Sequence, residues 1–224
     1  MHARLHGTFR TVPLVPPTMA WDQTAFLAAI TSDLSGIILE SPNNPTGLAL
    51  PLEGVEKVVA KAHQLGVWVL VDEAFGDFLP MQQSAVNLIS KYDNLVVTRS
   101  LSKVWGMPGL RVGALISNAP TITMLSHLVD PFMVGTLDRA VAVHVLEHCP
   151  DHAATSCIKI SADKAKIMAV CNSSPLVLIV AATTMSVPIL TITHVDPTVD
   201  LCSLLHSLGV HTCPGNSFEG LGIN

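Results

Sequence analysis

The chain has 224 residues and a mass of 23.8 kDa, which is enough for one large α/β domain with a smaller partner domain. Its net charge of −5 and the lack of a basic stripe argue against nucleic acid as a partner, because binding would need cations that neutralise phosphates. Five cysteines without C-x-x-C spacing predict reduced thiols in the cytoplasm, and the first residues lack the apolar run of a secretory signal.

Apolar runs and helical spacing alternate along the first half of the chain. Gly36–Glu40 predicts a short strand. Apolar residues then recur at helical spacing from Pro51 onward, so we expect a helix that stops at Gly66. The run VWVLV at 67–71 follows directly. Because it is apolar at every position, it predicts a strand that is covered on both faces of its sheet.

The alternation continues through NLVVT at 94–98 and RVGALIS at 111–117, which predict two further strands, and then through helical stretches that reach His148. Strands and helices joined by short connections predict an α/β fold with a mostly parallel sheet and crossover helices. After about residue 150 the alternation weakens. We therefore predict a large domain over residues 1–150 and a smaller C-terminal α+β domain over residues 151–224.

The segment Pro175–Thr193 is long and almost free of charge, a property that it shares with membrane spans. Pro188 and the polar residues of 183–186 divide it into two runs that are rich in valine, isoleucine and leucine. We expect two buried strands joined by a turn, and no membrane as a partner.

Polar side chains follow three of the predicted strands. Asn43 and Asn44 follow the first strand, Asp72 follows the second, and the segment RSLSKVWGMPGLRVG at 99–113 follows the third. In an open parallel sheet, ligands bind just beyond the carboxyl ends of the strands. We therefore expect these groups to converge on one cleft.

The segment 99–113 combines hydroxyls, cations and glycines. Ser100 and Ser102 can donate hydrogen bonds to a phosphate, and the Arg111 guanidinium can donate two parallel, charge-assisted hydrogen bonds to the same group. Lys103 can form an imine with an aldehyde if a partly desolvated pocket removes its proton. The carboxylate of Asp72 would lie against a flat, positively charged group of the ligand. An aldehyde, a phosphate and a ring nitrogen that benefits from a carboxylate together indicate pyridoxal 5'-phosphate.

Three segments, SPNNPTG at 41–47, VDEAFGDF at 71–78 and the segment 99–113, resemble in order and separation the signature segments of the fold-type I aminotransferases, which depend on pyridoxal phosphate. The likeness is strongest to the branch that holds histidinol-phosphate aminotransferase and threonine-phosphate decarboxylase. It implies an aminotransferase that acts on an amino acid or amino-acid phosphate, with decarboxylation of a phosphorylated amino acid as the alternative. It also implies a homodimer.

The resemblance assigns a role to each candidate residue. Lys103 would be the Schiff-base lysine and would carry the proton between the substrate and the cofactor. Asp72 would pair with the pyridine nitrogen, and Asn44 would bind the ring's 3-oxygen near the substrate carboxylate. The residues that would hold the phosphate are Ser100, Ser102 and Arg111.

The sequence departs from this family pattern at three points. Many relatives have a tyrosine three residues after the aspartate, but Phe75 stands at this cofactor-binding position and donates no hydrogen bond, which fits the decarboxylase side of the branch. An upstream glycine-rich phosphate loop and a late arginine for the substrate carboxylate have no counterpart in this sequence. We therefore expect a chain shortened at both ends, with a relative that binds the cofactor but is catalytically impaired as an alternative.

Two other interpretations stay open. HVLEH at 144–148 matches the H-x-x-E-H motif of zinc peptidases, with His144 and His148 as ligands, Glu147 as the base and Glu219 as an imagined third ligand. Pro150 ends that helix at once, so no metal is expected.

Each candidate site residue, taken alone, also fits an ordinary turn, cap or surface ion pair. The order in which these residues occur together favours one site.

Overall fold

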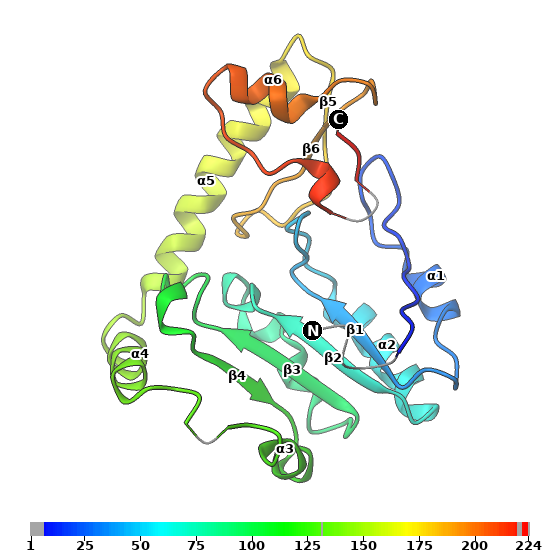
Figure 1. Ribbon diagram of the computed structural model, residues 1–224, viewed down its shortest axis with the longest axis vertical. Coiled ribbons are helices and arrows are strands. Elements are labelled where there is room, and N and C mark those ends of the chain that lie inside the picture. The colour runs from blue at the N-terminus through cyan, green and yellow to red at the C-terminus, as the bar shows by residue number, and fades with distance from the viewer. Residues whose placement is uncertain (1–6, 131, 219–220, 224) are drawn as a thin grey trace.

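The computed structural model describes residues 7–130, 132–218 and 221–223 (Figure 1). The helices and strands of this part are, in chain order, α1 (Gln23–Ala28), β1 (Gly36–Glu40), α2 (Leu52–Gln64), β2 (Trp68–Glu73), β3 (Leu95–Ser100), β4 (Gly113–Ile116), α3 (Ala119–Ser126), α4 (Thr136–His148), α5 (His152–Ser173), β5 (Leu178–Val180), β6 (Ile192–His194) and α6 (Leu201–Ser207).

Four strands form the main sheet in the order β1-β2-β3-β4. β1 pairs with β2 and β2 pairs with β3 in parallel, whereas β4 runs antiparallel to β3. The chain between β1 and β2 forms α2, which lies behind the sheet in Figure 1. The predicted α/β class with a mostly parallel sheet is therefore confirmed.

One face of α2 forms half of the core. Val55, Val58, Val59 and Ala62 recur at helical spacing and are at most 3% exposed, because they pack against buried residues of the sheet. The helix ends at Gln64, shortly before the predicted stop. The odd-numbered residues of β2 and β3 supply the other half of this core, with Leu95 fully buried at its centre.

The opposite face of the main sheet is open, so the prediction of a strand covered on both faces is wrong. Within β2, Val69 and Val71 are buried, whereas Trp68 is 41% exposed. Ile38 of β1 and Leu115 of β4 are 65% and 45% exposed. The run at 67–71 is apolar throughout, but alternate side chains of a strand point to opposite faces, and only one face packs against α2. Composition alone does not reveal this difference.

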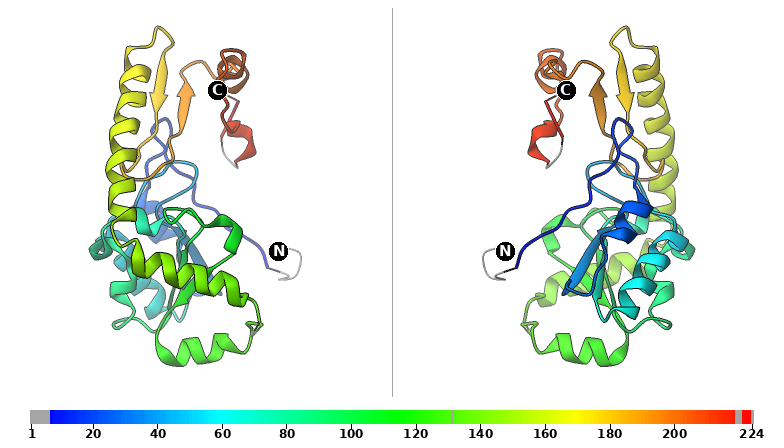
Figure 2. Two further views of the ribbon diagram at one scale, coloured as in Figure 1. Left: turned by 90° about the vertical axis from the view of Figure 1, so that its left-hand side faces the viewer. Right: turned by 90° about the vertical axis from the view of Figure 1, so that its right-hand side faces the viewer.

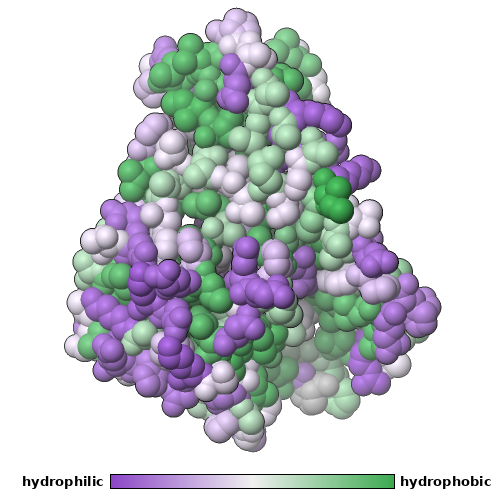
Figure 3. Space-filling view, turned by 180° about the vertical axis from the view of Figure 1, so that it is seen from behind, coloured by the Kyte–Doolittle hydropathy of each residue, from purple (hydrophilic) through white to green (hydrophobic). Residues whose placement is uncertain are grey.

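The C-terminal part contains α5, α6 and a small antiparallel sheet of β5 and β6 (Figure 2). β5 and β6 are three residues long and half-buried, so the prediction of two buried strands joined by a turn is only partly correct. The residues 181–191 between them form a longer connection. Figure 3 shows apolar side chains gathered toward this end of the molecule. The division at residue 150 stays a prediction.

No helix in the described part of the chain is long and apolar enough to cross a membrane. α5 is the longest of the described helices, and it contacts β5 and the turn Gly76–Phe78, which follows β2. It therefore links the C-terminal part to the main sheet.

Replacement of Leu95 by alanine should lower the free energy of unfolding by about 2–5 kcal/mol, because the side chain is fully buried and leaves a cavity. Leu115→Ala is the matched control in the same sheet; since Leu115 is 45% exposed, its loss should be below about 1 kcal/mol. Urea unfolding followed by circular dichroism measures both. Equal losses for the two variants would contradict this account of the core.

Candidate functional site

Three polar side chains form a row across the open face of the main sheet. The parallel register pairs Glu40 of β1 with Asp72 of β2, and Asp72 with Thr98 of β3. Residues paired in this way point to the same face, on strands about 4.8 Å apart. The row lies near the carboxyl ends of all three strands, which is the edge where the sequence predicts a cleft.

Asp72 is held in a fixed orientation within this row. Its Oδ1 accepts hydrogen bonds from the hydroxyl of Thr98 at 3.0 Å and from the backbone N–H of Ala74 at 2.9 Å. Among the residues that the structure describes, no donor bonds to Oδ2. One carboxylate oxygen is therefore fastened to the protein while the other remains available to a ligand.

Lys103 lies on the loop after β3, close to the segment that follows β2. Its Nζ is 4.8 Å from the centre of the Phe75 ring, which itself stacks on Phe78 with ring centroids 6.1 Å apart. The lysine side chain is exposed. The amine therefore rests on an aromatic face rather than in an ion pair, and it is open to a ligand.

The charges of Lys103 and Asp72 both affect the pKa of Glu40. Burial raises the pKa of Glu40 above its ordinary value of 4.5, and the Asp72 carboxylate also raises it, whereas a hydrogen bond from the backbone of Asn44 and the charge of Lys103 lower it. Because both Asp72 and Lys103 act on the same half-buried side chain, the two predicted residues lie in one neighbourhood. The Glu40 Oε2 also accepts a hydrogen bond from Asn43 Nδ2 at 3.2 Å.

A buried ion-pair network fixes the segment after β2 against the segment after β3. Arg99 Nε lies 2.8 Å from Glu73 Oε2, and Arg99 Nη1 pairs with Asp77 Oδ1. Trp105 Nε1 donates a hydrogen bond to Asp77 Oδ2 at 2.8 Å. The Arg99 side chain is 11% exposed, so water screens these charges weakly. The network holds the chain on both sides of Lys103 in place relative to Asp72.

The network also depends on a glycine. A Cβ atom at Gly76 would lie 2.8 Å from the Cβ of Glu73 and 3.0 Å from the guanidinium carbon of Arg99, which is closer than real side chains approach. Glu73 further accepts hydrogen bonds from the Ser84 hydroxyl at 2.7 Å and the Ala85 backbone N–H at 2.6 Å. Position 76 must therefore be glycine, because a side chain there would collide with Glu73 and the Arg99 guanidinium.

Ser100 is the last residue of β3, and Ser102 and Arg111 lie on the loop between β3 and β4, but only the two serines are joined. The Ser100 hydroxyl accepts a hydrogen bond from the backbone N–H of Ser102 at 3.2 Å. Arg111 is exposed, has a left-handed backbone with φ of 55°, and donates from Nη1 to the Pro108 carbonyl at 3.1 Å. Within the described residues, no hydrogen bond or ion pair links Arg111 to either serine. Its role at a phosphate stays a prediction.

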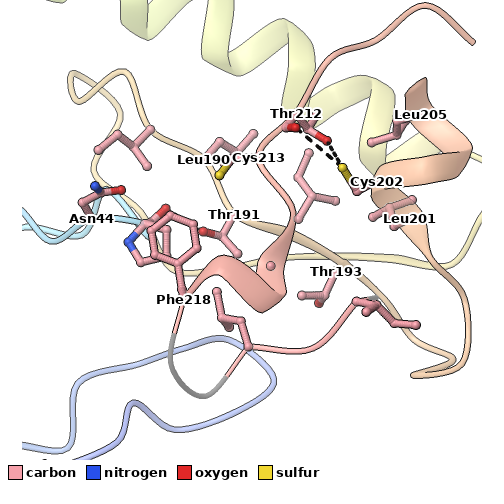
Figure 4. Close-up of a pocket in the computed structure, with 16 residues that line it drawn as sticks. Asn44, Leu190, Thr191, Thr193, Leu201, Cys202, Leu205, Thr212, Cys213 and Phe218 are labelled. Carbon is pink, nitrogen blue, oxygen red and sulfur yellow. Dashed lines mark hydrogen bonds between the residues drawn. The ribbon is translucent and has the colours of Figure 1, made fainter. Parts of the chain in front are cut away.

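Asn44 lies on the loop after β1, at the side of a cavity of about 290 Å³. Figure 4 shows Asn44 at one end of this cavity and Leu205 and Cys202 at the other. Apolar side chains of the C-terminal part dominate the lining, with Thr191 and Thr193 adding hydroxyls. The cavity therefore joins the predicted cofactor edge of the sheet to the C-terminal part.

The alternative zinc site does not assemble in the described part of the chain. His144 and His148 lie on α4 with ring centroids 4.3 Å apart, and His148 Nδ1 is 2.9 Å from the His144 carbonyl. Among the described residues, no group of three or more histidine, cysteine, aspartate or glutamate side chains could hold a metal ion. Glu219 lies outside those residues. The geometry gives the peptidase interpretation no support.

Sequence reasoning missed Glu40, Thr98 and the role of Arg99. Glu40 ends an otherwise apolar strand, and this single charge could have marked it. Thr98 and Arg99 become visible only once the register of the strands is known, because no local motif indicates which residue pairs with Asp72. Pairing across strands is information that a single sequence does not state.

The profile of the family described as aminotransferase class I and II matches residues 3–219. Histidinol-phosphate aminotransferase 2 of Ralstonia nicotianae is 39% identical over 127 residues, which are 56% of this chain and 34% of that protein. The chain thus spans about a third of the length of that curated relative.

Solved structures share the fold. The histidinol-phosphate aminotransferase of Clostridium acetobutylicum superposes with a TM-score of 0.84 at 22% identity, over 98% of this chain and 66% of that one. The L-threonine-O-3-phosphate decarboxylase of Porphyromonas gingivalis superposes with a TM-score of 0.74 at 18% identity, over 91% of this chain and 62% of that one. At these identities the likeness concerns the fold alone.

Replacement of Glu40 by glutamine should stabilise the protein at neutral pH. The raised pKa of Glu40 means that the folded state binds more protons than the unfolded state just above pH 4.5, so the carboxylate lowers stability as pH rises through that window. Glutamine removes the charge and still accepts the Asn43 hydrogen bond. Below pH 4.5 the gain should vanish. Urea unfolding of both proteins from pH 4 to pH 8 tests this; a gain that is the same at every pH would contradict it.

Proposed function

This chain belongs to the class I and II aminotransferases, a family whose members depend on pyridoxal 5'-phosphate, and we propose that it binds this cofactor and transfers the amino group of an amino acid or amino-acid phosphate. One observation supports the proposal most directly. Asp72 pairs in register with Glu40 near the end of β2, and Lys103 Nζ lies 4.8 Å from the ring of Phe75, three residues after Asp72, so a carboxylate and an amine from separate segments share one edge of the sheet.

The groups at this edge match the chemistry of the cofactor. Asp72 Oδ2 is available to a protonated ring nitrogen, and Lys103 Nζ is open to an aldehyde. The hydroxyl of Ser100 already accepts a bond from the Ser102 backbone, so its own proton remains to be donated to a phosphate oxygen. A carboxylate, an amine and hydroxyls that surround one edge of a parallel sheet suit a flat ring with a phosphate tail.

When bound, pyridoxal phosphate supplies an aldehyde that combines with amines and a ring that accepts electrons from the substrate's alpha carbon. In our proposal, Lys103 Nζ removes and returns the proton on that carbon. Asp72 Oδ2 keeps the ring nitrogen protonated, and the hydrogen bonds from Thr98 and Ala74 hold this carboxylate in place. Asn44 orients the ring's 3-oxygen and the substrate carboxylate.

The cavity beside Asn44 is the proposed site of the substrate side chain. It lies between the loop after β1 that carries Asn44 (residues 41–51, the Asn44 loop) and the C-terminal part. Apolar groups and threonine hydroxyls make up most of its lining. Such a lining accepts a small organic side chain and offers a few hydrogen bonds for orientation. The cavity therefore suits the carbon skeleton of an amino-acid side chain.

Decarboxylation of a phosphorylated amino acid is a second candidate, and Phe75 is the observation that favours it. The Phe75 ring lies under Lys103 Nζ and offers no hydroxyl to the cofactor. Both reactions begin with the same bound substrate and separate according to whether its alpha proton or its carboxylate leaves. Keto-acid formation from an amino-acid phosphate supports transamination, whereas release of carbon dioxide supports decarboxylation.

We also propose that the protein forms a homodimer, and exposed apolar side chains support this. Leu128, Phe132 and Leu137, between α3 and the start of α4, are 81%, 88% and 81% exposed. A run of large apolar side chains in water is typical of an interface.

Lys103→Ala should abolish the covalent link to the cofactor. With pyridoxal phosphate added, wild type should develop an absorbance band near the visible edge, and borohydride should fix the cofactor to the peptide that contains Lys103. The variant should show neither, and any transamination should fall by roughly 10²–10⁴-fold. Lys159→Ala, an exposed lysine of α5, is the control. Identical spectra for wild type and Lys103→Ala would refute the assignment; binding without turnover would indicate a catalytically impaired relative.

Phe132→Asp combined with Leu137→Asp should convert a dimer to a monomer, because the two charges would enter the proposed interface. Light scattering after size exclusion measures the mass. Ile158→Asp, which changes a 73% exposed side chain of α5, is the control and should leave the dimer intact. A wild-type protein that stays monomeric at every concentration would end this proposal.

A further inference from the structure

Lys164 on α5 is a buried cation that the proposed chemistry does not use. It is 4% exposed, although lysine is among the residue types that are rarely buried. Its Nζ donates hydrogen bonds to the Thr183 hydroxyl at 2.6 Å, the Thr184 carbonyl at 2.9 Å and the Val187 carbonyl at 2.8 Å. The three acceptors account for all three protons of an ammonium group.

Each acceptor belongs to the loop between β5 and β6, and the same loop bonds to the Asn44 loop. The Thr184 backbone N–H donates to the Gly47 carbonyl at 3.0 Å, and the Thr184 hydroxyl accepts from the Ala49 N–H at 2.9 Å. Thr191 Oγ1 donates to the Pro45 carbonyl at 2.6 Å. The contacts run from Lys164 through Thr184 to Gly47 and Ala49, three and five residues after Asn44, and Thr191 of the same loop reaches Pro45.

The approach of the two loops is close. Gly47 has φ of 72°, and a Cβ atom there would lie 2.5 Å from the Ile189 carbonyl oxygen and 2.8 Å from the Thr183 hydroxyl. The Thr183 hydroxyl is also the group to which Lys164 donates. The lysine therefore fixes the surface against which the Asn44 loop is packed.

Among the residues that the structure describes, Lys164 has no anionic partner that would explain its burial. On α5, Asp163 pairs with Lys166 at 3.0 Å in solvent. The turn Gly76–Phe78, which packs against α5, carries Asp77, and this carboxylate is bound to Arg99 and Trp105. On the same face of α5 as Lys164, the other titratable groups are the thiols of Cys157 and Cys171, seven residues to either side.

Burial lowers the pKa of Lys164 from 10.5 to about 8. Burying a charge without an anionic partner costs stability, and at Lys164 the three hydrogen bonds to the β5–β6 loop offset that cost.

We propose that Lys164 is a positioning residue, whose three hydrogen bonds hold the β5–β6 loop against the Asn44 loop and thereby set the place of Asn44. The inference rests on the proposed function for its link to the cofactor. Its structural part, the ordering of the Asn44 loop, is independent of that function.

The test replaces Lys164 by methionine, which fills the space and donates no hydrogen bond. Pyridoxal phosphate, titrated into the full chain and followed by absorbance, should bind Lys164→Met at least about fivefold more weakly than wild type. Thr184→Val removes the bond to the Ala49 N–H without a change of charge and should weaken binding in the same direction. Lys166→Met, on the exposed side of α5, is the matched control and should bind like wild type.

Hydrogen exchange provides a readout that does not require the cofactor. In Lys164→Met, the backbone N–H groups of Ala49 and Thr184 should exchange faster, while those of the main sheet stay protected. A role confined to overall stability would instead alter exchange everywhere. Unchanged exchange at both groups would overturn the inference even if wild type fails to bind pyridoxal phosphate, a failure that would count against the proposed function alone.

The pH dependence of stability tests the buried amine itself. Because the pKa of Lys164 is lower in the folded than in the unfolded chain, the unfolded state binds more protons between about pH 8 and 10.5, and stability rises across that window. The stability of wild type relative to Lys164→Met should therefore increase from pH 8 to pH 10.5. A constant difference would contradict the burial of the amine between α5 and the β5–β6 loop, on which the inference rests.

Discussion

The parallel, in-register pairing of β1, β2 and β3 is the constraint on which the candidate site depends. It aligns Glu40, Asp72 and Thr98 in one row and brings the loops after all three strands to the same edge. No local sequence preference could do this, since the three residues are separated by more than two dozen positions along the chain. The backbone ladder sets the separation of the reactive groups, and the side chains then adjust the electrostatics between them.

Two further sets of contacts add precision to that edge. The buried pairs of Arg99 with Glu73 and Asp77 fasten the segments that carry Asp72 and Lys103 to each other. The β5–β6 loop, held by Lys164, supports the Asn44 loop from the other side. The first set lies within the main sheet and its loops, whereas the second connects that sheet to the C-terminal part. The orientation of the candidate residues therefore depends on both the main sheet and the C-terminal part.

The sequence was a good guide wherever a single segment contains the relevant information. β1, α2 and the main parallel strands follow from apolar periodicity, and Asp72 and Lys103 stand out because polar groups follow apolar runs. It was a poor guide where the outcome depends on what packs against a segment. Trp68 and Val69 are both apolar, yet only Val69 faces α2 and is buried. Likewise, no pattern around Lys164 indicates that a lysine on a long helix is enclosed by three acceptors from a loop some twenty residues later.

The Arg99 network also limits how this protein can change. A guanidinium between two carboxylates and a bare glycine backbone leaves little room for an isolated replacement. Loss of one partner of the more buried pair, Arg99 with Glu73, would leave a charge that is mostly removed from solvent, at a cost of about 3–5 kcal/mol. Positions 73, 76, 77 and 99 must therefore vary together or not at all. In homologues that keep this fold, substitutions on the segment after β2 should therefore be accompanied by substitutions at position 99, so that the two segments covary.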